Sequence, residues 1–427
     1  MCKHGYGVAL YPPPEVGGLR QRQIKVMVKA GYWFIDTFAL CYSYRYLVTK
    51  RQQQKGLPMQ NSQHALTLAQ INALTEEQID KKLRLALDNA IDRIDLTYEQ
   101  MREVMLLIMT GKCNDARMGA MLTALRMKSE SIDEITAAAA VMRELAERIE
   151  PTNPERLVDI VGTGGDGANL FNVSTASALV AATAGVKVAK HGNRSVSGKS
   201  GSSDVLAQAG VKLDLSHDET LACLEQQNLG FLFAPNHHPA MRHAMPVRRA
   251  LGMRTLFNIL GPLTNPAGAV NAVIGVFTPK LCLPLAKVLQ ELGDKHVMVV
   301  GSNDGLDEIS LAAGTQVAEL KDGNIEVYEL MPEDVGIDSQ TLIGLEVATS
   351  EQSLALIRVA LSGEETHSKT VLKARDMIAR NAGAAIFVGG LASNLPNGVN
   401  IAQSVIQSGD ALHKMHNFTK FTQSFGK

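Results

Sequence analysis

After Pro151 the sequence alternates between short apolar runs and segments of helical length. Five of these runs are long enough to form a strand, at residues 157–161, 186–189, 230–234, 273–277 and 295–301. Strands separated by helices are typical of a mainly parallel sheet that helices cover on both faces. We therefore predict an α/β domain over residues 151–427.

The preceding segment, residues 75–150, has helical signals only. Thr97 with Gln100, and Ser131 with Glu134, have the spacing of a capping box, in which two side chains bond the free amides of a helix start. Further helices are expected over residues 80–95 and 113–128. We predict a small all-helical domain here, joined by helices from about residues 235–260 and packed on the larger α/β domain.

Residues 1–58 have a different composition from the rest of the chain. They contain 6 of the 8 tyrosines, the single tryptophan, and 9 basic against 2 acidic residues, with no clean helical or strand period. The basic and apolar order could indicate a targeting peptide, but the apolar part starts too late. A genuine accessory segment is another possibility. We prefer to interpret residues 1–74 as a poorly ordered extension, with Met59 a plausible true start.

A chain that begins at Met59 is accordingly expected to keep the specific activity and melting temperature of the full chain. A segment with no apolar face gains too little from burial to offset the entropy lost on ordering. Activity assays and thermal unfolding of the two chains compare them directly. A melting temperature several degrees lower for the shorter chain would show that the segment is a structural element.

The overall composition excludes several classes of protein. The formal net charge is −1, from 42 basic and 43 acidic residues, so there is no general basic surface for nucleic acid. The longest aromatic and apolar stretch, residues 32–46, is too short to cross a bilayer and contains charges. The five cysteines lie far apart with no CxxC pair, which favours a reducing, cytoplasmic location over a disulfide framework. We expect no nucleic-acid or membrane partner.

The first predicted strand leads directly into a glycine-rich loop, residues 162–167, with the sequence GTGGDG. Such a loop lets several backbone amides approach one phosphate group, and a helix that begins near residues 172–175 (NVST) would direct its free amides at the same anion. A tight turn without a ligand is the alternative. Asp166 argues against a dinucleotide, because its carboxylate would repel a pyrophosphate that has no cation beside it.

A second loop, residues 190–198, follows the next strand with the sequence KHGNRSVSG, and hydroxyl residues continue to Ser203. Two cations and several hydroxyls at the carboxyl end of a parallel strand indicate an anion site. The triplet at residues 198–200 is not part of a nucleotide-hydrolysing P-loop, because that motif needs glycine at position 193 and Asn193 stands there.

Two further clusters contain possible metal ligands. His237, His238 and His243 lack the HExxH spacing of a zinc site, and zinc is disfavoured there. Asp307 and Glu308 follow the strand that ends at residue 301, and adjacent carboxylates suit Mg²⁺, which prefers oxygen ligands. For this pair alone, a solvated acidic turn would be the simpler interpretation.

Taken together, these motifs resemble those of the anthranilate phosphoribosyltransferase family: GTGGDG, NVST, KHGNR, a Val-Arg-Arg triplet at residues 247–249, LFNILGPLTNP at residues 256–266, and the Asp-Glu pair. The resemblance covers roughly residues 80–427 and stops short of the first 58. It implies a nucleoside phosphorylase-like fold, a site between the helical and α/β domains, and a homodimer.

The resemblance also implies roles for individual residues. Phosphoribosyl pyrophosphate (PRPP) would be held by Gly162, Gly165, Asp166, Leu170, Asn172, Val173, Ser174, Thr175, Lys190, His191, Gly192, Asn193, Arg194, Ser195, Val196, Ser197, Gly198 and Ser202. Ser174, Asp307 and Glu308 would bind Mg²⁺, and Gly162, Asn193 and Arg248 would line the path of anthranilate. Leu170 departs from the family, which usually has a hydroxyl residue there that touches the phosphate end of PRPP. No nucleophile or general base is assigned.

The implied reaction transfers the phosphoribosyl group from PRPP to the amine of anthranilate, in tryptophan biosynthesis. Two alternatives remain. A pyrimidine nucleoside phosphorylase would share the fold and the anion loop, but the Asp307–Glu308 pair and Arg248 favour a Mg²⁺-bound pyrophosphate donor. A non-enzymatic relative that binds nucleic acid would be expected to lose the glycine loop or the acidic pair, and both are present.

Overall fold

The computed structural model describes residues 66–194 and 200–426. These residues belong to one compact unit, residues 62–427. The predictions for residues 1–58, and for a start at Met59, lie outside the described residues.

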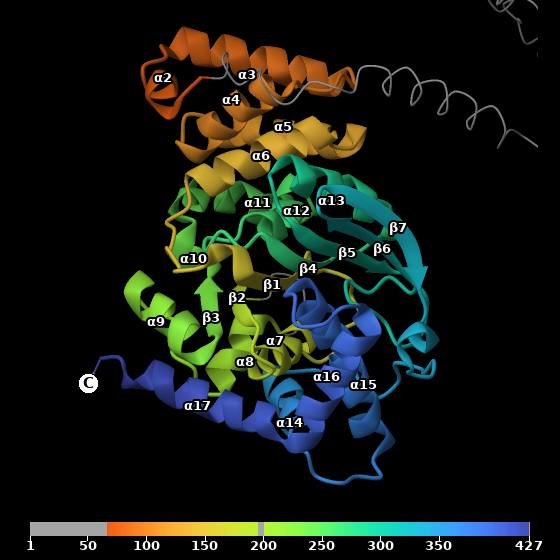
Figure 1. Cartoon of the computed structure of the whole chain (residues 1–427). Coiled ribbons are helices and arrows are strands. Elements are labelled where there is room, and N and C mark those ends of the chain that lie inside the picture. Colours follow the sequence, from red (N-terminus) through yellow and green to blue (C-terminus); the bar gives the residue numbers. More distant parts are fainter. Residues whose placement is uncertain (1–65, 195–199, 427) are drawn as a thin grey trace, which may run out of the picture. The chain divides into compact units, whose positions relative to one another are not determined.

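The helical domain is a stack of helices that begins earlier than residue 75 (Figure 1). Its helices are α2 (Leu68–Asn72), α3 (Glu76–Ile91), α4 (Tyr98–Met109), α5 (Asp115–Lys128) and α6 (Ile132–Glu144). Both expected capping boxes are present, at the starts of α4 and α6. The helix α2 lies within the range that the sequence assigned to the extension. It has its own capping box at Thr67 and buries Ile71 completely.

The α/β domain contains one seven-stranded sheet, in the order β3-β2-β1-β4-β5-β6-β7. The five strands expected from the sequence are confirmed and are all parallel: β1 (Leu157–Gly162), β2 (Lys187–Gly192), β3 (Leu229–Phe233), β4 (Asn271–Gly275) and β5 (His296–Ser302). Two further strands, β6 (Thr315–Lys321) and β7 (Asn324–Leu330), extend the sheet antiparallel to β5. The sheet is therefore mainly parallel, as predicted.

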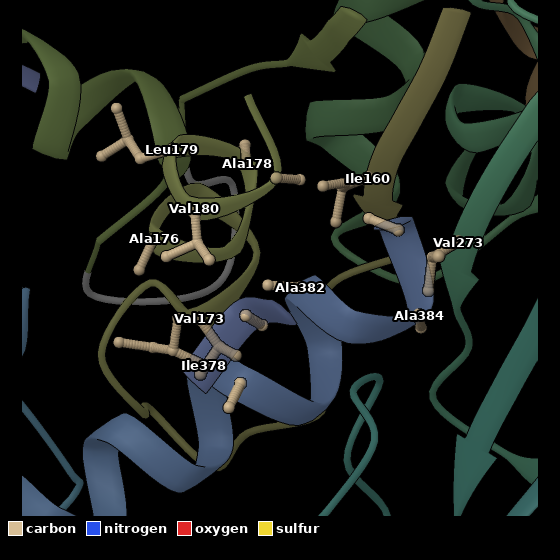
Figure 2. Close-up of a cluster of buried hydrophobic side chains, with 14 of the residues drawn as sticks. Ile160, Val173, Ala176, Ala178, Leu179, Val180, Val273, Ile378, Ala382 and Ala384 are labelled. Atoms are coloured by element: carbon tan, nitrogen blue, oxygen red, sulfur yellow. The ribbon is translucent and has the colours of Figure 1, made fainter. Parts of the chain in front are cut away.

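Helices cover both faces of the sheet, and the sheet separates two large hydrophobic cores. On one face, α7 (Val173–Thr183) and α15 (Lys369–Val388) pack against the strands through small and branched side chains, among them Ala178, Ala382 and Val273 (Figure 2). On the other face, α13 (Cys282–Glu291) lies between the sheet and α6 (Figure 1). The remaining helices are α8 (Ser202–Gln208), α9 (His217–Gln227), α10 (Ala234–His237), α11 (Met245–Leu251), α12 (Leu256–Leu260), α14 (Ser350–Ala360), α16 (Leu395–Ser408) and α17 (Asp410–Ser424).

Two helices of the segment near residues 235–260 contact the helical domain: α11 packs on α5, and α12 on α6. A buried ion pair adds a polar link, because Arg143 of α6 donates to both carboxylate oxygens of Asp294, at 3.0 and 3.1 Å. The same guanidinium donates to the carbonyl of Leu263. The helical domain is thus fixed to the segment that follows α12 as well as to the sheet.

In the part of the chain that the structure describes, no helix is both long enough and apolar enough to cross a membrane.

Candidate active site

Three segments that follow parallel strands meet at one edge of the sheet: the glycine loop after β1, the start of α7, and the acidic pair after β5. The amide of Gly164 donates to Oδ2 of Asp307 at 2.6 Å. Glu308 accepts from Ser174 through one oxygen, Oε1, which lies 3.2 Å from the amide nitrogen and 2.5 Å from Oγ. The acidic pair therefore joins the two elements that the sequence indicates as phosphate-binding.

The glycine loop requires its glycines for two different reasons. Gly164, Gly165 and Gly167 have φ of +68°, +78° and +80°, a region that side chains with a Cβ rarely adopt. Gly162 needs space instead, because a Cβ there would lie 2.5 Å from Oδ2 of Asp307. The loop is thereby able to lie against the acidic pair with its backbone.

A glycine on the neighbouring strand faces the same segment. A Cβ on Gly275, the last residue of β4, would lie 1.6 Å from the carbonyl oxygen of Asp307. The backbone of the acidic pair therefore packs directly on the backbone of β4.

The start of α7 is held from two sides. The amide of Asn172 donates to Oγ of Ser353 at 2.9 Å, and the hydroxyls of Ser353 and Ser200 both donate to Oδ1 of Asn172 at 2.9 Å. Val173 is a core residue, so only its backbone can face a ligand. Thr175 is 3% exposed, and its Oγ1 has no hydrogen-bond partner among the described residues.

Three carboxylates gather at this edge and affect one another. Burial raises the pKa of Asp307, and the nearby Asp166 raises it further. Burial and the charge of Asp307 likewise raise the pKa of Glu308, against the hydrogen bond from Ser174, which lowers it. A cation among them would relieve both the burial cost and the repulsion.

The donor set of Ser174, Asp307 and Glu308 fits Mg²⁺ better than it fits a metal that is bound by protein side chains alone. Hard carboxylate and hydroxyl oxygens are the ligands Mg²⁺ prefers, and it commonly completes its shell with substrate phosphates. Among residues 66–194 and 200–426, no three His, Cys, Asp or Glu side chains form a group that could hold a metal by themselves. Ser174, Asp307 and Glu308 would thus leave several coordination positions to the substrate and water.

The second predicted anion loop starts below the surface. Lys190 is 4% exposed and donates its Nζ to the carbonyl of Ile160 at 2.5 Å, and burial lowers its pKa despite the nearby Asp159. His191 is also buried, with Nδ1 3.2 Å from the carbonyl of Gly261. Burial, together with the neighbouring histidines, lowers the pKa of His191 to about 3.

The rest of that loop comes to the surface. Asn193 and Arg194 are exposed. Gly192 lies close to Ser202 at the start of α8, where a Cβ would be 2.5 Å from the serine Oγ. The predicted contacts of Ser195, Val196, Ser197 and Gly198 lie outside the described residues.

Arg248 is a half-buried cation on α11. Its guanidinium lies 5.3 Å from the ring centre of Phe257, and its Nη1 approaches Sδ of Met245 at 3.9 Å. Burial is the sole cause that lowers its pKa, so within the described residues no neighbouring carboxylate compensates for the lost solvation. Such a group is suited to a carboxylate supplied by a ligand.

The structure also shows the contacts of Leu170 and of the adjacent histidines, His237 and His238. Leu170 packs against the core beside α7 and forms an isolated bridge to Glu346. His237 and His238 point to different partners: His237 stacks on His217 with ring centres 4.9 Å apart, whereas His238 lies beside His191.

Sequence reasoning missed residues that contact this site from distant positions. Arg254 donates to the carbonyl of Gly165 and lies 4.1 Å from the ring centre of Phe277, while Arg126 of α5 donates to the carbonyl of Arg254. Asn381 of α15 bonds the backbone that follows the acidic pair. Arg254 does stand two residues before the LFNILGPLTNP motif, which is the signal that could have drawn attention to it.

Comparisons with known proteins cover almost all of the described chain and agree with the resemblance that the sequence motifs indicate. A model described as "Glycosyl transferase family, a/b domain" matches residues 154–412, and the helical bundle domain of the same family matches residues 84–146. A relative from Psychrobacter sp. (strain PRwf-1), named anthranilate phosphoribosyltransferase, is 64% identical over 359 residues, which cover 83% of this chain and 97% of the relative.

Solved structures agree as well. The anthranilate phosphoribosyltransferase of Thermus thermophilus is 41% identical with a TM-score of 0.73, covering 79% of this chain and 99% of that one. The enzyme of the same name from Saccharomyces cerevisiae, in complex with PRPP and Mg, is 25% identical with a TM-score of 0.70, covering 82% and 99%.

Proposed function

The chain belongs to the anthranilate phosphoribosyltransferase family, and from this premise we propose how its residues perform the reaction of that family. The enzyme transfers the phosphoribosyl group from PRPP to the amine of anthranilate, in tryptophan biosynthesis, and uses Mg²⁺. The observation that supports this site most directly is the pair of contacts by which Asp307 and Glu308 join the glycine loop to the start of α7.

The donor substrate would bind across those joined elements. The amides of the glycine loop and the first turn of α7 would supply partial positive charge, and the hydroxyls of Ser174, Thr175 and Ser202 would add hydrogen bonds to the donor. Asn193 and Arg194, which are exposed, would contact the donor. Lys190 is buried near the acidic pair, and its Nζ bonds the carbonyl of Ile160. It would therefore act on the site through its positive charge.

Ser174, Asp307 and Glu308 would hold Mg²⁺, which when bound neutralises the charge of the departing pyrophosphate. The anthranilate nitrogen forms its bond to the anomeric carbon as the bond from that carbon to the pyrophosphate oxygen breaks, and the nitrogen then gives one proton to the solvent. An aromatic amine is largely uncharged at neutral pH, so its nitrogen has a free electron pair and needs no strong base for activation. The chain's task is chiefly to position both substrates and exclude other orientations.

The direct test follows the loss of anthranilate fluorescence after purified protein is mixed with PRPP and Mg²⁺. Loss that requires all three components is expected, and omission of Mg²⁺ in the presence of a chelator is the control. A phosphorylase would instead cleave a pyrimidine nucleoside in a phosphate-dependent assay. Retention on DNA that falls with salt would indicate the nucleic-acid-binding alternative.

Arg248→Ala is expected to raise the KM for anthranilate about ten- to a hundredfold with much less effect on the KM for PRPP. A hydrogen-bonded charge pair contributes roughly 1.5–3 kcal/mol, and here it would be lost for one substrate only. Steady-state kinetics with each substrate varied in turn measure the two effects. Arg249→Ala, at an exposed position one residue further along α11, is the matched control. Equal effects of Arg248→Ala on both substrates would contradict this assignment.

We also propose a homodimer in the cytoplasm. The helical domain exposes several large apolar side chains by more than half, and two of them, Ile91 and Met127, line a hollow of about 770 Å³ between α5 and α11. These side chains are Leu85, Ile91, Ile94 and Met127. A second copy would cover such a surface, and sedimentation equilibrium measures the mass of the assembly.

The cytoplasmic location is supported by the cysteines. Cys113, Cys223 and Cys282 are free thiols, which suits a reducing compartment.

A further inference from the structure

The helix α15 passes directly behind the acidic pair and presents two buried polar side chains to it. Arg380 and Asn381 are each 1% exposed, although the helix is otherwise packed into the core on most sides. They contact the two residues that follow the acidic pair: Asn381 bonds the backbone of Ile309, and Arg380 bonds the backbone of Ser310. Polar side chains at such positions are costly unless they are bonded, so their partners indicate why they are there.

Asn381 bonds both sides of one residue of the acidic segment. Its Oδ1 accepts from the amide of Ile309 at 2.9 Å, and its Nδ2 donates to the carbonyl of the same residue at 3.1 Å. The Nδ2 also donates to the carbonyl of Met377, one turn earlier on α15, at 2.9 Å. A side-chain amide is the group that supplies an acceptor and two donors in one plane, so no apolar residue reproduces this arrangement.

Arg380 adds a second contact to the same backbone. Its Nη1 donates to the carbonyl of Ser310, whereas Nε and Nη2 have no hydrogen-bond partner among the described residues. Ser310 is in turn held by Asp304, whose Oδ2 accepts from the serine hydroxyl at 2.6 Å. The backbone immediately after Glu308 is therefore fixed from within the protein.

The opposite side of the acidic pair has contacts of a different kind. The carboxylate oxygens of Asp307 and Glu308 bond Gly164 and Ser174, which belong to the proposed donor site. Those oxygens are the atoms that would exchange partners when Mg²⁺ binds, while the bonds from α15 involve only the backbone of Ile309 and Ser310. The bonds from α15 can thus persist in both states.

We propose that Asn381 is a positioning residue for Mg²⁺: by holding the backbone of Ile309, it sets where the carboxylates of Asp307 and Glu308 lie. Arg380 supports the same segment one residue further on. This inference rests on the proposed role of Asp307 and Glu308 as Mg²⁺ ligands. Residues that orient the ligands of a metal typically change its affinity about ten- to a hundredfold when they are replaced.

The test compares Asn381→Leu, which keeps the branched shape of the side chain and removes every hydrogen bond, with Asn271→Leu as a matched control. Asn271 is likewise buried and donates to two backbone carbonyls, those of Glu155 at 2.9 Å and Leu157 at 3.0 Å, but at the amino end of β4. Both variants lose stability. We expect only Asn381→Leu to raise the Mg²⁺ concentration for half-maximal turnover, by about ten- to a hundredfold, with the KM for anthranilate changed less than about twofold.

A second measurement does not depend on turnover. The rise in melting temperature on adding PRPP with increasing Mg²⁺ should need correspondingly more Mg²⁺ in Asn381→Leu, and should be unchanged in its Mg²⁺ requirement in Asn271→Leu. If Asn381→Leu does not fold, Asn381→Ser, which keeps one hydroxyl, gives the same comparison with a smaller shift. An unchanged Mg²⁺ requirement in the Asn381 variants, or an equal rise in Asn271→Leu, would overturn the proposal. A wild-type chain without Mg²⁺-dependent turnover would instead refute the proposed function.

Discussion

Replacing Gly275 with alanine is expected to reduce turnover at least about a hundredfold, because a misplacement of about 1 Å at a reacting site can cost that much. The added Cβ would lie 1.6 Å from the carbonyl oxygen of Asp307 and 2.5 Å from its carbonyl carbon, distances that real Cβ atoms do not show. Both contacts are to backbone, so no change of rotamer relieves them. The acidic pair or the end of β4 has to move.

The same substitution should lower the free energy of unfolding by about 1–3 kcal/mol, the usual cost of overpacking. Steady-state kinetics and thermal unfolding measure the two effects separately. Gly261→Ala is the control, because Gly261 has a helical φ of −50° and nothing lies within 4 Å of an added Cβ. If Gly275→Ala kept more than a tenth of the wild-type turnover, the backbone of the acidic pair would have more freedom than its packing indicates.

Exchanging both acids for amides, Asp307→Asn with Glu308→Gln, is expected to lower turnover by at least about a hundredfold and to raise the Mg²⁺ requirement. Neutral amides are poor Mg²⁺ ligands, and the metal contributes several kcal/mol of charge stabilisation. Stability should respond in the opposite direction. Burial raises the pKa of both carboxyls, so the folded chain holds their charged forms at a cost that neutral side chains remove.

The melting temperature of this double variant, measured in a chelator at neutral pH or above, should therefore equal or exceed that of the wild type. Mg²⁺ titrations of turnover and of the melting temperature distinguish a lost metal site from a lost fold. An unchanged Mg²⁺ dependence would exclude Asp307 and Glu308 as ligands. A large fall in melting temperature without metal would instead give the pair a structural role.

The parts of the fold that the sequence predicted are those with a local signal. The five parallel strands are apolar runs, and the capping boxes at Thr97 and Ser131 involve residues only three positions apart. The strands β6 and β7 were not anticipated. Their own signal is the turn at Asp322 and Gly323, where both residues have positive φ, as two-residue hairpin turns require.

The site was predictable as a set of motifs, whereas the directions of its side chains were not. The order of the motifs predicted that the glycine loop, α7 and the acidic pair would belong to one site. The sequence does not indicate that Lys190 directs its Nζ at Ile160, since that depends on how β1 and β2 align. Asn381 lies 72 positions from Ile309, and Arg254 lies 89 positions from Gly165. Contacts over such separations follow from tertiary packing and have no local pattern.

Two hydrogen bonds connect the helical domain to the glycine loop, from Arg126 to Arg254 and from Arg254 to Gly165. Through them, the position of the helical domain would be linked to the affinity for PRPP. Any shift of α5 relative to Gly165 strains or breaks one of these two hydrogen bonds. A donor that favours one arrangement of the glycine loop therefore favours one placement of α5, and with it of α11, which packs on α5 and includes Arg248. Linkage of this kind is reciprocal, so a change that PRPP made in the affinity for anthranilate would be matched by an equal change that anthranilate made in the affinity for PRPP.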